Sequence, residues 1–160
     1  MKKIIATILA NILVTTFSMK VIAHEGHEDK TASAENAGAV GKPVKSKKFD
    51  RIINITMNDQ MKFQPENISI KKGETIKFVV KNVGKVDHEI VMGSPEELKE
   101  HAEMMKQMPG MKHADANQLV LAPNKSGSMM WKFLSAGIIE YACLQPGHNE
   151  AGMNGKITIE

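Results

Sequence analysis

Short runs in which apolar and polar residues alternate begin at Phe49 and recur to the end of the chain. This period of two is typical of half-buried β-strands, and turn residues such as Lys72-Gly73 and Pro123-Asn124 separate the runs. The predicted strands cover residues 51–57, 68–70, 75–80, 88–92, 127–133, 138–143 and 155–159. So many short strands favour the all-β class, and specifically an antiparallel Greek-key β-sandwich.

One helix interrupts this pattern. Ser94 is a predicted N-cap, Pro95 occupies the first helical position, and Glu97 completes a capping box. Pro109-Gly110 is expected to end the helix. Residues 94–118, which are rich in methionine and histidine, are therefore predicted to form a short helical insertion in the sandwich domain.

The N-terminal part of the chain lacks the strand pattern. Lys2 and Lys3 precede an apolar segment, residues 4–17, which is shorter than the ~20 apolar residues that a membrane span needs. Residues 1–23 are predicted to be a signal peptide cleaved after Ala23, with a retained N-terminal anchor as the alternative. Cleavage predicts a periplasmic protein with no membrane anchor. Residues 24–48 are predicted to be a flexible tail, and the folded domain is expected to cover residues 49–160.

Charge and cysteine content exclude several classes of protein. The chain has 21 basic and 18 acidic residues, but three of the basic ones and none of the acidic ones lie in residues 1–23. The remainder is neutral, so no nucleic-acid partner is expected. A single cysteine excludes a disulfide within the chain. The chain also has no CxxC motif, which excludes the common zinc, thioredoxin-like and c-haem sites.

The candidate chemistry lies near the C-terminus, where Cys143, His148 and Met153 follow one another at five-residue intervals. Soft sulfur ligands together with imidazole favour copper, and a His₂Cys site with a weak axial Met requires a second histidine. His88 is the remaining histidine on a predicted strand, so the predicted ligands are His88, Cys143, His148 and Met153. Taken singly, Cys143 and Met153 would more often be core residues, and His148 a loop residue.

The order and spacing of these residues resemble those of the cupredoxins, the type 1 or blue copper proteins, over roughly residues 49–160. The spacing C-x4-H-x4-M is similar to that of rusticyanin and auracyanin, and residues 61–68 and 72–78 look like the early strands of the family. The resemblance implies one ion that cycles between Cu(I) and Cu(II). Two positions depart from many members, because Glu89 and Leu144 stand where those have Asn and Ser or Thr. Since hydrogen bonds near the thiolate tune a copper site, the redox potential cannot be carried over.

Two further groups of residues could bind copper. The insertion contains soft or imidazole ligands within thirteen residues: His101, Met104, Met105, Met108, Met111 and His113. Thioethers suit Cu(I), but the same helix could simply dock on the sandwich through Leu98, Ala102 and Met105. After cleavage, His24 and His27 could chelate Cu(II) together with the new α-amine, or they could belong to a charged, disordered end.

These features together resemble the periplasmic copper-tolerance cupredoxins, which carry a His-rich N-terminus and a Met-rich insertion. The resemblance implies a protein that binds copper ions and changes their redox state. It also implies an interaction with a periplasmic redox or copper-trafficking protein. The alternative is an electron shuttle that docks on a redox enzyme through the surface around His148. No enzyme activity is expected. Four protein ligands leave no open position for a substrate, and a cuprous oxidase would need an oxygen site that the sequence lacks.

Overall fold

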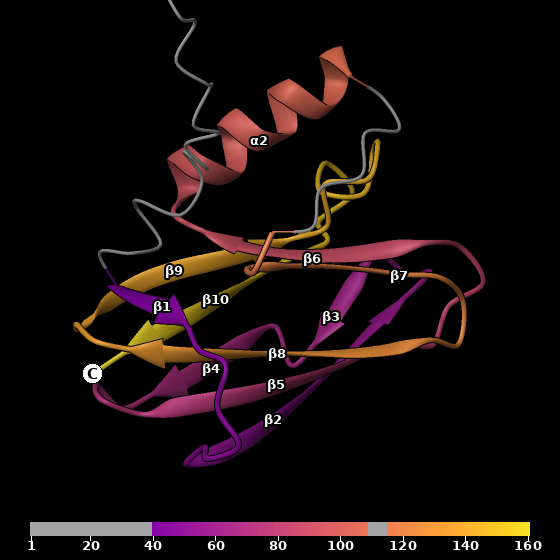
Figure 1. Ribbon diagram of the computed structural model, residues 1–160. Helices are drawn as coiled ribbons and strands as arrows, with labels where there is room; N and C mark the ends of the chain where they lie inside the picture. The colour runs from indigo at the N-terminus through magenta and orange to yellow at the C-terminus, as the bar shows by residue number, and fades with distance from the viewer. Residues whose placement is uncertain (1–39, 109–114) are drawn as a thin grey trace, which may run out of the picture. The chain divides into compact units, whose positions relative to one another are not determined.

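Two β-sheets form the part of the chain that the computed structural model describes, residues 40–108 and 115–160 (Figure 1). The first sheet has the strand order β1 (Gly41–Pro43), β8 (Ser126–Phe133), β5 (Thr75–Asn82), β2 (Arg51–Asn58) and β3 (Lys62–Gln64). The second has the order β4 (Asn67–Ile70), β10 (Asn154–Ile159), β9 (Gly137–Ala142), β6 (His88–Gly93) and β7 (Gln118–Leu121). The predicted all-β sandwich is confirmed.

Strand direction differs in part from the prediction. β2 pairs with β5 in parallel, and β10 pairs with β4 in parallel, whereas the other neighbours are antiparallel. The prediction of a purely antiparallel sandwich was therefore wrong for these two pairs. The reason is the path of the chain, which visits the second sheet at β4 before it returns to the first at β5. Such a crossover allows parallel pairing, whereas a tight hairpin does not.

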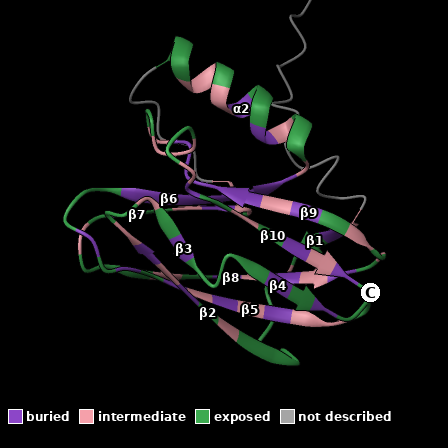
Figure 2. Ribbon diagram, turned by 180° about the vertical axis from the view of Figure 1, so that it is seen from behind, coloured by how far each residue is buried: buried purple, intermediate pink, exposed green. Residues whose placement is uncertain are grey.

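An apolar core fills the space between the sheets. The alternation along each strand turns one side chain in two toward it, as the buried Ile76, Phe78 and Val80 of β5 show (Figure 2). Phe63 and Tyr141 come from different sheets and meet edge to face with their ring centroids 5.0 Å apart. β6 departs from the alternation because all six of its residues are buried. Both faces of this strand are therefore covered.

The outer cover of β6 is the helix α2 (Pro95–Gln107), which contacts β6 and β9. It begins as predicted. The Ser94 side chain accepts a hydrogen bond from the Glu97 N–H, and the Glu97 carboxylate accepts one from the Ser94 N–H. Leu98 and Ala102 belong to a small apolar cluster on the outer side of the second sheet. No helix within the described residues combines the length and the apolar character needed to span a bilayer.

Two short strands, β1 and β7, were missed from the sequence, and β3 was indicated only by the family resemblance of residues 61–68. They have three or four residues each, which is too short for alternation to stand out. β1 also corrects the domain boundary, because Gly41–Pro43 pairs with β8 although the prediction placed it in the flexible tail. A Cβ at Gly41 would collide with Lys132 and Trp131, so the chain packs closely there. The rest of the predicted tail up to residue 39, and the predicted signal peptide, lie outside the described residues.

Candidate metal centre

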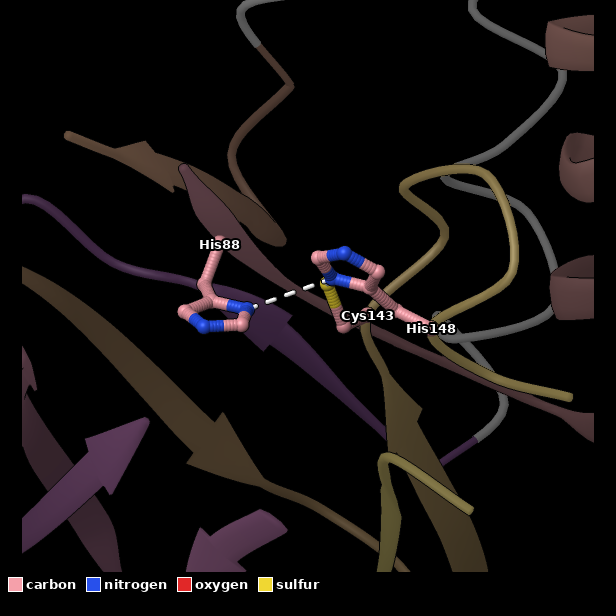
Figure 3. A group of neighbouring side chains, drawn as sticks. All are labelled: His88, Cys143 and His148. Carbon is pink, nitrogen blue, oxygen red and sulfur yellow. Dashed lines mark hydrogen bonds between the residues drawn. The ribbon is translucent and has the colours of Figure 1, made fainter. Parts of the chain in front are cut away.

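Three of the four predicted ligands meet at one end of the second sheet (Figure 3). β6 and β9 are antiparallel neighbours, so the start of β6, with His88, lies at the same end as Cys143, which follows β9. His88 Nδ1 lies 3.2 Å from His148 Nδ1, and Cys143 Sγ lies 3.3 Å from the same His148 nitrogen. One ligand atom from each of the three residues lies within 4.8 Å of the others.

The fourth predicted ligand, Met153, immediately precedes β10 and is fully buried. Its backbone ties the other ligands together. The Met153 carbonyl accepts a hydrogen bond from the Cys143 N–H at 3.0 Å, and the Met153 N–H donates one to the His148 carbonyl, also at 3.0 Å. Met153 and Cys143 belong to the same buried apolar cluster. The thioether is therefore part of the core that lies beneath the ligand loop, residues 143–153.

Local hydrogen bonds shape the ligand loop. The His148 N–H donates to the Gln145 carbonyl, and the Gly152 N–H donates to the Asn149 carbonyl. Gly147 and Gly152 have φ values of 82° and 93°, which L side chains rarely adopt. These two glycines allow the chain to reverse between the ligands, and this explains their place in the spacing noted in the sequence.

Burial sets the protonation state of the two loop ligands. It raises the pKa of the Cys143 thiol to about 11, although the Glu89 N–H donates to Sγ at 3.4 Å and opposes the shift. Burial, followed by the charge of His88, holds the pKa of His148 below its ordinary value. At neutral pH the metal-free site thus contains a thiol and a neutral His148 imidazole. Since metals bind the thiolate, an incoming ion has to displace the Cys143 proton.

A carboxylate that sequence reasoning missed reaches His88 from the other sheet. Asp59, in the turn after β2, places Oδ1 at 3.2 Å from His88 Nε2, the ring nitrogen opposite the one that faces the ligand cluster. The two Asp59 oxygens accept the Lys85 N–H at 2.9 and 2.8 Å. This Lys85 bond is the main reason why the pKa of Asp59 is lowered. Nothing in the local sequence separates this residue from an ordinary turn aspartate.

The donor set fits copper. Two ligands held ~2.0–2.3 Å from one ion at a tetrahedral angle are roughly 3.5 Å apart, close to the 3.2 and 3.3 Å contacts of this cluster. One thiol sulfur, two imidazoles and a nearby thioether are the soft and intermediate ligands that copper prefers over magnesium, calcium or manganese. The arrangement can hold a single copper ion with little movement of its ligands.

The residues proposed as secondary copper ligands are placed differently. On α2, His101 is buried and Met104 and Met105 are half-buried, whereas Met108, directly after the helix, is 39% exposed. Within residues 40–108 and 115–160, the one group of three or more His, Cys, Asp or Glu side chains with metal-ligand spacing is the His88 cluster. The other four predicted ligands lie outside the described residues: His24, His27, Met111 and His113. The packing of Leu98 and Ala102 confirms that the helix docks on the sheet.

The helix also lies beside the ligand loop. A groove of about 430 Å³ is lined on one side by Leu98, Ala102 and Lys106 of α2 and on the other by Asn149 and Glu150 of the loop. Lys106 Nζ and Glu150 Oε1 are 3.7 Å apart across it. Both side chains are more than half exposed, so this pair adds little stability, but it shows that helix and loop are neighbours.

Comparison with known proteins agrees with this chemistry. The profile of the copper-binding proteins of the plastocyanin/azurin family matches residues 50–160. The copper-resistant cuproprotein CopI of Rubrivivax gelatinosus is 40% identical over 151 residues, covering 89% of this chain and 90% of its own. CopI of Vibrio cholerae is 34% identical over 126 residues, which cover 78% and 75% of the two chains. Among solved structures, reduced auracyanin of Roseiflexus castenholzii matches with a TM-score of 0.58 and 20% identity, covering 69% of this chain and 96% of that one.

Proposed function

The chain belongs to the plastocyanin/azurin family of copper-binding proteins, and we propose that it protects the cell against excess copper by binding the ion in the periplasm. The observation that carries this proposal is that His88, Cys143 and His148 each bring one ligand atom within 4.8 Å of the others, so that one metal ion could bind all three. Similarity to two cuproproteins whose names describe copper resistance supports the tolerance role.

The proposed centre is a type 1 site, in which His88, Cys143 and His148 would hold copper and Met153 would be a weak fourth ligand. Copper bound there would exchange one electron with a redox partner and so pass between Cu(I) and Cu(II). The contribution of the protein is to hold the ligands in place. His88 and Cys143 are fully buried, the ligand loop is tied by backbone hydrogen bonds, and the Glu89 N–H faces the sulfur. Such restraint keeps the rearrangement between the two states small.

The half-buried thioethers of α2 are proposed to capture Cu(I) near this site. Met104 and Met105 lie on a helix that borders the ligand loop across a shared groove, so a captured ion would have a short path to the centre. His24 and His27 are proposed to bind Cu(II) once cleavage after Ala23 has made His24 the first residue. The protein would then act outside the cytoplasm, and the mass of its exported form tests that cleavage site directly.

Copper stoichiometry and growth test the proposal together. Cells without the gene should grow normally in ordinary medium and poorly in added copper, and the wild-type gene should restore tolerance. A Cys143→Ser variant should fail to restore it. A variant with Met104, Met105, Met108 and Met111 changed to leucine should lose the Cu(I) proposed to bind there and keep the copper of the His88 centre. Unchanged copper tolerance in the deleted strain would contradict the proposal.

The second candidate function is an electron shuttle. Its support is the position of His148, which is only partly buried and would bring an electron close to the surface. A shuttle predicts one copper ion per chain, rapid electron exchange with a respiratory partner, and impaired respiration without copper sensitivity when the gene is removed. In either role we propose a binding protein and no enzyme. Sustained oxidation of Cu(I) by air at a rate proportional to the protein would contradict this.

A further inference from the structure

We propose that Asp59 is a positioning residue of the copper site, which holds the His88 ring in the one tautomer and orientation that can bind metal. The inference rests on the proposed function only in taking His88 as a ligand. It assigns a role to a residue of the other sheet, 29 positions away in the sequence.

The two ring nitrogens of His88 face different partners. In a neutral imidazole one nitrogen carries the proton and the other carries a lone pair. An ionised carboxylate can only accept hydrogen bonds, so the 3.2 Å contact between Asp59 Oδ1 and His88 Nε2 requires the proton on Nε2. The lone pair is then on Nδ1, which lies 3.2 Å from His148 Nδ1 in the ligand cluster. Partners of this kind fix the ring and raise the basicity of the ligating nitrogen.

Asp59 is itself held in place by the loop that leads into His88. The Lys85 N–H donates to both carboxylate oxygens. Gly84 lies so close to Asp59 that a Cβ on it would collide with the carboxylate. The buried Asn82 fixes the same loop, because its Oδ1 accepts the Gly84 N–H at 2.8 Å and its Nδ2 donates to the Leu121 carbonyl, also at 2.8 Å. Residues 82–88 therefore fold around the Asp59 carboxylate, which contacts both the Lys85 N–H and the His88 ring.

The negative charge has a separate effect from the hydrogen bond. A carboxylate next to a ligand favours the more highly charged Cu(II) over Cu(I), because opposite charges attract more strongly as the charge increases. Asparagine at position 59 keeps an oxygen that can accept the Nε2 proton but removes the charge. Alanine removes both. The two variants therefore separate positioning from electrostatics.

The first experiment uses the metal-free protein and needs no copper. Nitrogen-15 NMR of the imidazoles should show His88 protonated on Nε2 in the wild type and in Asp59→Asn, and a mixture of tautomers in Asp59→Ala. Asp87→Asn is the matched control, since it removes an exposed charge next to His88 in the chain and keeps the contact between Asp59 and the ring, and it should leave the tautomer unchanged. A wild-type His88 protonated on Nδ1, or an unchanged tautomer in Asp59→Ala, would overturn the proposal.

The second experiment uses the copper-loaded protein. Asp59→Ala should lower the Cu(II) affinity about 10- to 100-fold, as losses of such ligand partners do. Asp50→Ala is the control for folding, because Asp50 also accepts a backbone hydrogen bond, from Thr75 at 2.7 Å, at the far end of β2. It should change the affinity less than about threefold. An equal loss in both variants would show a general structural effect and overturn the positioning role.

The third measurement covers the case in which Asp59→Ala does not fold. Asp59→Asn should raise the midpoint potential, by about 59 mV for each tenfold loss of Cu(II) relative to Cu(I) affinity. A shift no larger than that of Asp87→Asn would refute the effect of the charge, and a wild-type His88 protonated on Nδ1 would overturn the positioning role. Failure of the wild type to bind copper would instead refute the proposed function, and the NMR result on the metal-free protein would still decide the role of Asp59.

Discussion

Raising the pH should strengthen copper binding, because copper has to displace the proton of Cys143. Burial raises the pKa of this thiol to about 11, so nearly every metal-free molecule at pH 7 carries the proton. The apparent affinity of a ligand that must lose one proton rises tenfold for each pH unit below its pKa. The expected slope of log affinity against pH is therefore one between pH 7 and pH 9.

The structure also gives the size of this effect. The difference of about four units between pH 7 and the thiol pKa means that binding at pH 7 is weaker by about 5 kcal/mol than binding to the thiolate, at 1.36 kcal/mol per unit. His148 adds nothing in this range, because its lowered pKa makes it neutral above pH 7. As the pH falls through that pKa, protons begin to compete for His148 as well, and the slope should increase.

Competition with a chromophoric Cu(I) chelator, whose own affinity is known at each pH, measures the slope. Calorimetry in buffers with different heats of ionisation gives the same quantity as the number of protons released, which should be close to one. The Cys143→Ala variant is the control, and its residual binding should be independent of pH over the same range. A wild-type slope near zero would show that the thiol is already ionised in the metal-free site, and the reasoning from burial would be refuted.

Three further outcomes are expected. The metal-free protein should lose about 2 kcal/mol of stability to the ionisation of Cys143 between pH 9 and 11, since the pKa of this thiol is raised from 9.0 to about 11 by folding and the unfolded chain ionises first. Urea unfolding at both ends of this range measures it as the difference between the wild type and Cys143→Ala, because the buried Tyr141, whose pKa is also raised, destabilises both proteins equally. Leu98→Ala should cost about 2 kcal/mol of unfolding free energy, because Leu98 is buried in the small cluster beneath α2, and it should leave copper bound. Met153→Leu should change stability by less than about 1.5 kcal/mol but shift the absorption spectrum of the copper protein, and an identical spectrum would exclude the thioether as a ligand.

Most of the main strands of the sandwich could be predicted because they turn one side chain in two toward the core. β5 and β8 have eight residues each, which is long enough for this alternation to be recognised. β1, β3 and β7 are edge strands of three or four residues, and their pairing depends on partners far away in the sequence. The parallel pairs were missed for a related reason, since strand direction follows from the path of the chain between the sheets.

The residues of the ligand cluster also differ in how far the sequence could predict them. Cys143, His148 and Met153 could be recognised together because one loop carries them at fixed intervals. His88 was assigned from its place on a predicted strand, and the register of β6 with β9 brings it to the same end of the sheet. Asp59 could not be found, because its role depends on a contact between the two sheets that no local pattern records.

The two departures from the usual cupredoxin pattern each have a partner in the structure. Leu144 directly follows Cys143 and packs with Leu98 and Ala102 of α2. Glu89 directly follows His88, and its buried carboxylate accepts a hydrogen bond from Gln118, on β7.

An apolar residue at position 144 provides a surface on which the helix docks, and a small polar residue there would not. The Met-rich helix thus rests on the residue next to the copper thiol. A change that loosens the helix should therefore disturb the environment of the sulfur before it disturbs the fold. For Leu98→Ala this means a shift in the copper–thiolate absorption at full copper occupancy, whereas an unchanged band would show that helix and centre are independent.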